Sequence, residues 1–221
     1  TKVQLRRHDE ELGALLECLR RKGTLEQTNV VVLGDHGQTD IRDVLLMNVL
    51  FKKHGLLQAD SQGNITHFDA FCHSTGLAGL IEVRDPQDAA LMQKLLESLK
   101  EDKEIQLSTV MDAEQAKEAF GAYGPFDFVI ESALPISFGE DAAGELCWGS
   151  RMPGDHKIGA ATHGGTPRRE QVTTFFAWGP AVKPGVVPGH RSMVDEAPTM
   201  ARMLGLQMEQ IDGRPIEEIL R

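Results

Sequence analysis

Residues 29–38, NVVVLGDHGQ, join a short apolar run to a polar turn. Three valines and a leucine in succession, with no alternating polar position, are typical of a parallel-sheet strand that is covered on both faces. Asp35 and His36 follow the run, and open α/β sheets hold their ligands at this carboxyl end of the strands. Gly34 and Gly37 flank the pair and allow the backbone to bend there. The stretch therefore predicts a buried strand that presents an Asp–His pair.

Asp35 and His36 carry donor atoms that divalent transition metals prefer. Carboxylate oxygen and imidazole nitrogen suit zinc and related ions. Neighbouring side chains on an extended strand point to opposite faces, so one ion binds both only if the chain bends. The alternative is an ordinary turn, in which Asp35 accepts backbone hydrogen bonds and His36 is exposed. The pair taken alone favours that turn, because such pairs are common in turns.

A second stretch, residues 160–167 (AATHGGTP), places His163 before two glycines. Glycines after a histidine let the backbone come close to a metal ion or a phosphate. Residues 172–178 follow, and their apolar character predicts another buried strand. A loop histidine with turn glycines is again the alternative, and this stretch alone favours it.

The rest of the chain alternates between helical and extended patterns. Apolar residues at three- and four-residue steps predict helices, and short apolar runs predict strands. The alternation indicates an α/β fold whose core comprises residues 1–58 and 159–221, with an α+β insertion or cap at residues 59–158. We expect helices over residues 2–22, 43–54, 86–100, 113–120 and 194–204, and further strands over residues 105–110 and 126–130.

Charge and cysteine content narrow the class of protein. The net charge of -10 disfavours a nucleic-acid polymer or an anionic membrane as partner, because both are polyanions. No apolar run approaches the roughly 20 residues of a membrane span. The three cysteines are odd in number and far apart, which argues against a disulfide framework and fits a reducing compartment. We therefore expect a cytoplasmic protein.

The two polar stretches together resemble the type I phosphodiesterase/nucleotide pyrophosphatase family of the alkaline phosphatase superfamily. In that family a hydrophobic strand ends in Ser/Gly-Asp-His-Gly, matched by residues 34–37, and a late metal histidine lies in a Thr-His-Gly loop, matched by residues 162–164. The resemblance covers the first fifty and last seventy residues and is loose in between. Further matches are LFKKHGL at residues 50–56, FFAWGP at residues 175–180 and DEAPT at residues 195–199.

The resemblance implies a three-layer α/β/α fold with a largely parallel central sheet, of which this chain would lack the N-terminal part. It also implies two divalent metal ions, with zinc preferred over manganese because nitrogen ligands are present. Asp35 and His36 would bind one ion and His163 the other. The family's Thr or Ser nucleophile, which forms a covalent phospho-enzyme, has no counterpart here. We therefore expect no catalytic nucleophile in this chain and no activity from the chain alone.

The implied substrates are small phosphate esters or nucleotides. His156 and Lys157, in the stretch GDHK before the histidine loop, are candidate substrate contacts, and the alternative is a solvated charge pair. The missing N-terminal part would be a partner, and an uncovered sheet predicts self-association. Two other functions stay open. One is a phosphonate or phosphomonoester hydrolase of the same superfamily, and the other is a non-catalytic module that binds a metal or a partner.

Overall fold

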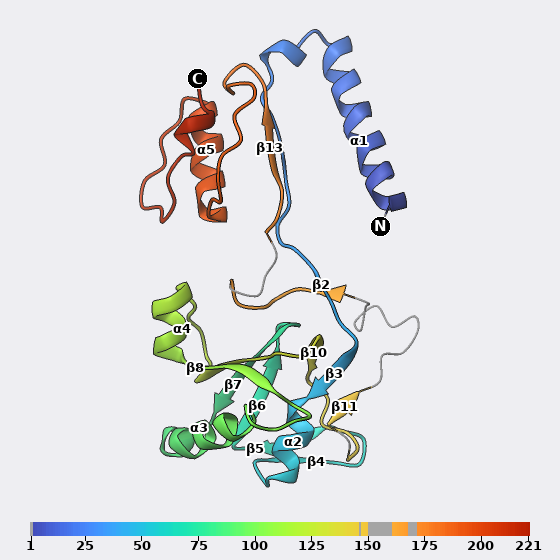
Figure 1. The fold of residues 1–221 in the computed structure, drawn as a ribbon, viewed down its shortest axis with the longest axis vertical. Helices are drawn as coiled ribbons and strands as arrows, with labels where there is room; N and C mark the ends of the chain where they lie inside the picture. Colours follow the sequence, from blue (N-terminus) through green and yellow to red (C-terminus); the bar gives the residue numbers. More distant parts are fainter. Residues whose placement is uncertain (1, 146, 150–160, 168–171) are drawn as a thin grey trace. The chain divides into compact units, whose positions relative to one another are not determined.

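The computed structural model describes residues 2–145, 147–149, 161–167 and 172–221 (Figure 1). Contacts divide the chain into two compact units, residues 1–34 with 174–221 and residues 35–173. The division into domains at residues 58 and 159 stays a prediction. No helix among the described residues combines the length and apolar character needed to cross a membrane.

The first unit pairs an early strand with a late one. Strand β1 runs antiparallel to β13, from Val30 opposite Trp178 to Leu33 opposite Phe175. The small core beside this ribbon consists of Ile216, Ile219 and Leu220, against which Phe175, Ala177 and Met203 pack. The elements are α1 (Lys2–Arg21), η1 (Leu25–Gln27), β1 (Val30–Leu33), β13 (Phe175–Trp178), η3 (Met193–Asp195), α5 (Glu196–Met203) and η4 (Glu217–Ile219).

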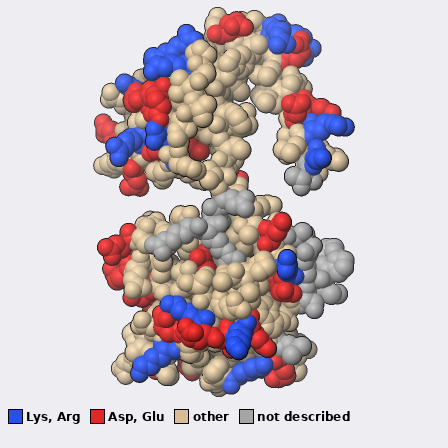
Figure 2. Space-filling view, in the orientation of Figure 1, with Lys and Arg blue, Asp and Glu red and all other residues tan. Residues whose placement is uncertain are grey.

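The prediction that β1 is covered on both faces is wrong for this unit. Val32 and Leu33 are 39% and 40% exposed. On β13, Phe176 and Trp178 alternate with the packed residues and are 66% and 49% exposed. The physical reason is that a two-stranded ribbon packed on one side leaves its other face open. Figure 2 shows the same feature as uncharged surface along the ribbon, with charges of both signs gathered elsewhere on the unit.

The second unit is built around a four-stranded antiparallel sheet in the order β6-β7-β9-β8. Side chains alternate between its faces, so Ile81 and Ile130 join the core that contains helix α3, whereas Leu80 and Val129 pack with helix α4. The elements are β2 (Thr39–Asp40), β3 (Asp43–Leu46), α2 (Met47–Lys53), β4 (Leu57–Ala59), β5 (Ile65–Phe68), β6 (Ala70–Ser74), β7 (Ala78–Val83), η2 (Pro86–Asp88), α3 (Ala89–Ser98), β8 (Leu107–Asp112), α4 (Ala113–Phe120), β9 (Phe128–Ser132), β10 (Ile136–Gly139), β11 (Trp148–Gly149) and β12 (Ala161–Thr162).

Local signals set the ends of the helices on this sheet. The carboxylate of Asp85 accepts a hydrogen bond from the Gln87 backbone, and Pro86 starts the turn that leads into α3. Asp112 and Gln115 form a reciprocal capping box at the start of α4. Gly121, with a φ of 68°, ends α4 in the left-handed conformation that glycine tolerates best. The helices predicted near residues 86–100 and 113–120 are confirmed.

Strand pairing corrects one prediction and tests the predicted fold class. Residues 43–46 form strand β3, not the start of a helix, because β10 pairs with them on one side and β11 on the other. The β3–β10 pair is parallel, whereas the remaining pairs between described strands are antiparallel. The mixed α/β class is confirmed. The three-layer arrangement with a largely parallel central sheet is not confirmed, because the described strands form small, mostly antiparallel sheets.

Candidate functional site

Asp35 and His36 lie where the chain bends shortly before strand β2. The backbone N–H of His36 donates to Oδ1 of Asp35 at 3.0 Å, as the ordinary-turn alternative requires. The other carboxylate oxygen, Oδ2, lies 3.4 Å from Nε2 of His36. The Asp35 side chain is 86% exposed and that of His36 is 30% exposed. The turn therefore presents an anionic oxygen and an imidazole nitrogen side by side.

A backbone carbonyl fixes the orientation of the His36 ring. Nδ1 of His36 lies 2.9 Å from the carbonyl oxygen of Gly37. A carbonyl oxygen can only accept a hydrogen bond, so Nδ1 carries the proton and donates it. In the neutral ring, Nε2 then keeps its lone pair. Metal-binding histidines are held in this manner, with the second ring nitrogen donating to a carbonyl or a carboxylate.

A short strand pair brings His163 to this turn. Strand β12 runs antiparallel to β2, with Thr162 opposite Thr39 and Ala161 opposite Asp40. The imidazole ring of His163 stacks on that of His36, with centroids 3.6 Å apart and planes at 14°. Two histidines that are far apart in the sequence therefore meet, and one of them, His36, also lies next to the Asp35 carboxylate.

The hairpin between β6 and β7 holds the backbone of the histidine loop. The N–H of Leu77 donates to the carbonyl of His163 at 3.0 Å, and the hydroxyl of Thr75 donates to the carbonyl of Gly164 at 2.6 Å. Gly76 and Gly164 have φ values of 103° and 85°, and a β-carbon on either would collide with the facing backbone. These two glycines let hairpin and loop pack backbone to backbone.

The donor set fits part of a metal site. Two imidazoles and a carboxylate are the groups that zinc prefers. Across the described ranges, however, no three His, Cys, Asp or Glu side chains are grouped as a ready metal cluster. The structure thus brings His36 and His163 together, with Asp35 next to His36. The candidate substrate contacts His156 and Lys157 lie outside the described residues.

The sequence interpretation missed two residues that support the loop, Gly76 and Glu131. Gly76 follows an apolar strand in the stretch CHSTG, which is a weak signal of a close backbone approach. Glu131 is a charged residue in the apolar strand β9, and it accepts two hydrogen bonds from Thr166 of the histidine loop. A carboxylate within an apolar strand was the signal that could have identified it.

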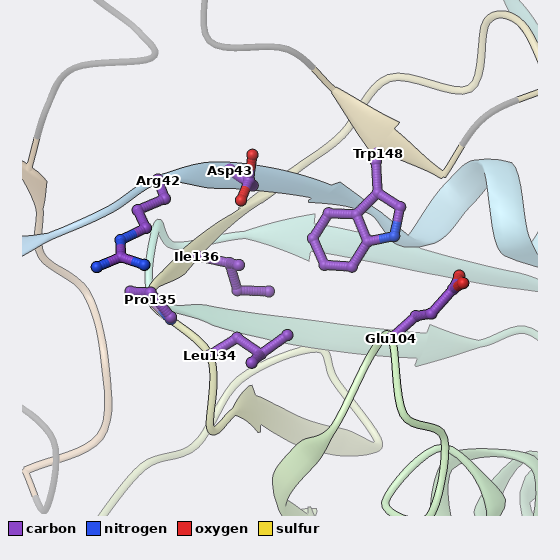
Figure 3. A pocket seen from close by; sticks show the side chains of 7 residues that line it. All are labelled: Arg42, Asp43, Glu104, Leu134, Pro135, Ile136 and Trp148. Carbon is purple, nitrogen blue, oxygen red and sulfur yellow. The ribbon is translucent and has the colours of Figure 1, made fainter.

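A separate hollow of about 420 Å³ lies elsewhere in the second unit (Figure 3). The indole ring of Trp148 lies over an apolar floor, and Arg42 occupies the opposite end. No histidine is among the described residues that line it, and its charged groups have mixed sign. We therefore do not count this hollow as part of the candidate site at His36 and His163. Its lining consists of Arg42, Asp43, Glu104, Leu134, Pro135, Ile136 and Trp148.

Comparison with known families gives a direct match. Residues 1–125, more than half of the chain, match the model of the family described as type I phosphodiesterase / nucleotide pyrophosphatase. The matched region contains Asp35 and His36 but not His163. No curated protein sequence matches the chain.

Solved structures match almost the whole chain. Murine ectonucleotide pyrophosphatase/phosphodiesterase 5, as an inactive variant in complex with AMP, gives a TM-score of 0.68 at 15% identity over 97% of this chain and 51% of that chain. The same murine protein in another structure gives 0.67, and the human protein gives 0.66, with the same identity and coverage. The chain thus spans about half the length of these structures. At this identity the likeness shows the fold alone.

Proposed function

The chain belongs to the type I phosphodiesterase/nucleotide pyrophosphatase family, and we propose that it supplies part of the metal centre of a hydrolase. The proposed reaction is cleavage of phosphodiester or nucleotide pyrophosphate bonds. The observation that carries the proposal is the stacking of His36 on His163, with the Asp35 carboxylate 3.4 Å from Nε2 of His36. The AMP bound to the murine relative supports a nucleotide as the substrate class.

We propose Asp35, His36 and His163 as ligands of divalent ions. Two such ions stabilise negative charge on the attacking and leaving oxygens of a phosphoryl transfer. Nε2 of His36 offers a lone pair because Nδ1 donates to Gly37, and the exposed Asp35 carboxylate adds an anionic donor. Nitrogen donors favour zinc over manganese. By resemblance, Asp35 and His36 serve one ion and His163 the other.

From the resemblance to the family, we propose that no Ser or Thr of this chain is the counterpart of the family's nucleophile. We therefore propose that turnover requires residues beyond those of this chain, and that the 221-residue chain alone is inactive. His156 and Lys157 remain proposed substrate contacts, through hydrogen bonding and positive charge near the phosphate. A reducing, cytoplasmic location remains the proposal from cysteine content.

Zinc titration of the 221-residue chain by calorimetry tests the ligand assignment. His36→Ala and His163→Ala are each expected to lower zinc affinity at least about tenfold, the smallest loss that even an outer partner of a metal site causes. His190→Ala removes an exposed histidine of the other unit and is the matched control. Equal affinity in all four proteins would refute the assignment.

Activity assays separate the proposed reaction from its alternatives. Full diesterase turnover by the isolated chain with zinc would contradict the predicted inactivity. A longer protein that includes the nucleophile is expected to prefer a diester over a monoester or a phosphonate. Preference for either of the last two would favour another hydrolase of the superfamily, and zinc binding by this longer protein without turnover would favour a non-catalytic module.

A further inference from the structure

Glu131 is a buried carboxylate in the middle of the second unit. It is 3% exposed and lies on β9, the strand that β7 and β8 flank in the four-stranded sheet. Within the described part of the chain it forms no ion pair, although a buried charge ordinarily requires partners that compensate its lost hydration. Such a group destabilises an apolar strand unless hydrogen bonds compensate for its lost hydration.

The carboxylate is satisfied by neutral donors from two sides. The hydroxyl of Thr109, on the neighbouring strand β8, donates to Oε2 at 3.2 Å. Thr166 donates twice, from its backbone N–H to Oε1 at 2.6 Å and from its hydroxyl to Oε2 at 3.1 Å. Two bonds from one residue define both the position and the orientation of Thr166, which is itself 6% exposed.

Thr166 belongs to the loop that carries His163. The β6–β7 hairpin binds this loop at the carbonyls of His163 and Gly164, and Glu131 binds it again just beyond the two glycines. Side-chain alternation along β9 places Glu131 on the face of Val129, opposite the face of Ile130 that packs against the main core. The sheet therefore holds the Gly164–Gly165 segment at both of its ends.

We propose that Glu131 is a positioning residue that acts through Thr166 to keep the His163 ring stacked on His36. The proposal rests on the proposed function only for its consequence for metal binding. A neutral amide of similar shape would lose the negative charge that strengthens the hydrogen bonds from both donors of Thr166. The carboxylate, which accepts from the N–H and the hydroxyl together, restricts the loop to one register against the sheet.

Two matched variants separate positioning of the loop from stability of the sheet. Thr166→Val and Thr109→Val each remove one hydroxyl that donates to the same oxygen of Glu131. Both changes are nearly isosteric, but only the first lies in the histidine loop. Glu131→Gln is the third variant, because it removes the negative charge that strengthens both hydrogen bonds from Thr166.

The primary readout is the NMR spectrum of the imidazole carbon-bound protons in the 221-residue chain. Stacked rings at 3.6 Å shift each other's resonances, and His36→Ala gives the reference spectrum for an unstacked His163. Thr166→Val and Glu131→Gln are expected to move the His163 resonances towards that reference, and Thr109→Val is expected to leave them unchanged. Equal shifts in the two threonine variants, or none in either, would overturn the proposal even if Glu131→Gln does not fold.

Zinc titration of the same variants adds the functional readout. If the wild-type chain binds zinc, Thr166→Val is expected to lose about tenfold in affinity, as outer partners of metal sites do, and Thr109→Val less than about twofold. Equal losses would again overturn the positioning role. Absence of zinc binding by the wild-type chain counts against the proposed function, and the NMR comparison then still decides whether Glu131 positions the loop.

Discussion

The rings of His36 and His163 lie stacked, with centroids 3.6 Å apart and planes at 14°. The contact depends on the pairing of Thr39 with Thr162, because each threonine lies within three residues of one histidine. At the edge of the His36 ring, Nδ1 faces the Gly37 carbonyl and Nε2 faces the Asp35 carboxylate. The candidate site is therefore a product of strand pairing, and changes that disturb the pairing or the loop are the ones to test.

Gly76→Ala is expected to destabilise the second unit more than Gly121→Ala. Both glycines have positive φ, which costs a residue with a β-carbon about 1–2 kcal/mol. A β-carbon at residue 76 would also collide with the carbonyl oxygen of His163, whereas the space around residue 121 is open. Urea unfolding of the two variants measures the difference, and the His163 resonances report the loop. Equal losses of stability would show that the hairpin moves away from the loop easily.

Asp112→Ala is expected to lower the free energy of unfolding by about 1 kcal/mol, the usual cost of losing a helix N-cap. The Asp112 carboxylate accepts from the backbone N–H of Gln115 at 2.8 Å, and the Gln115 side chain accepts from the backbone N–H of Asp112 at 3.1 Å. Asp112→Asn keeps an acceptor and is the matched control, with a much smaller loss. If both variants unfold at the same urea concentration, the capping box does not stabilise α4.

Cys72 is expected to resist thiol reagents in the folded chain. It is fully buried, and the loss of hydration, with a smaller contribution from the Glu140 carboxylate, raises the pKa of its thiol. Cys18 and Cys147 are partly exposed and are expected to react first. Mass spectrometry after timed alkylation measures the order, and reaction in denaturant, where all three react, is the control. Equal labelling rates in the native chain would contradict the burial of Cys72.

The raised pKa of Cys72 also sets the sign of a pH effect. The folded chain holds the thiol proton more tightly than the unfolded chain does. The protonated thiol therefore makes its full contribution to the free energy of unfolding below the ordinary thiol pKa of 9.0, and this contribution is lost as pH rises above that value. Stability is therefore expected to fall more steeply above pH 9 in the wild-type chain than in Cys72→Ala. Urea unfolding at a series of pH values measures both slopes, and identical slopes would refute the effect.

Self-association is expected through the open face of the β1–β13 ribbon. Phe176 and Trp178 expose their side chains there, opposite the residues that pack on the small core of the first unit. Exposed apolar ribbon faces with unpaired strand edges tend to pair with another chain. Light scattering is expected to show a smaller mass for Phe176→Ser than for the wild type. Tyr123→Ser changes an 86% exposed aromatic residue of the other unit and should leave the mass unchanged.

Much of the local structure could be predicted from neighbouring residues. The helices near residues 86–100 and 113–120 follow from apolar spacing, Pro86, Asp112 and Gly121, all of which act within a few residues of the helix. The family resemblance likewise rests on short motifs, and the match over residues 1–125 confirms it. These features were predictable because their causes are adjacent in the chain.

Pairings between distant segments decided the rest. Residues 43–46 have an apolar pattern that suits a helix or a strand, and the choice was made by β10 and β11 on either side. The sequence marks Glu131 only as a charged residue in an apolar strand, and its role depends on Thr166, which is 35 residues away in the chain and donates to it. The motifs supplied the types of residue at the candidate site and led us to expect His163 near Asp35 and His36, but the stacking of the two histidine rings is seen only in the tertiary structure. The pairing of β2 with β12 brings the two histidines into contact. Such long-range pairing depends on how the whole chain packs rather than on any local preference.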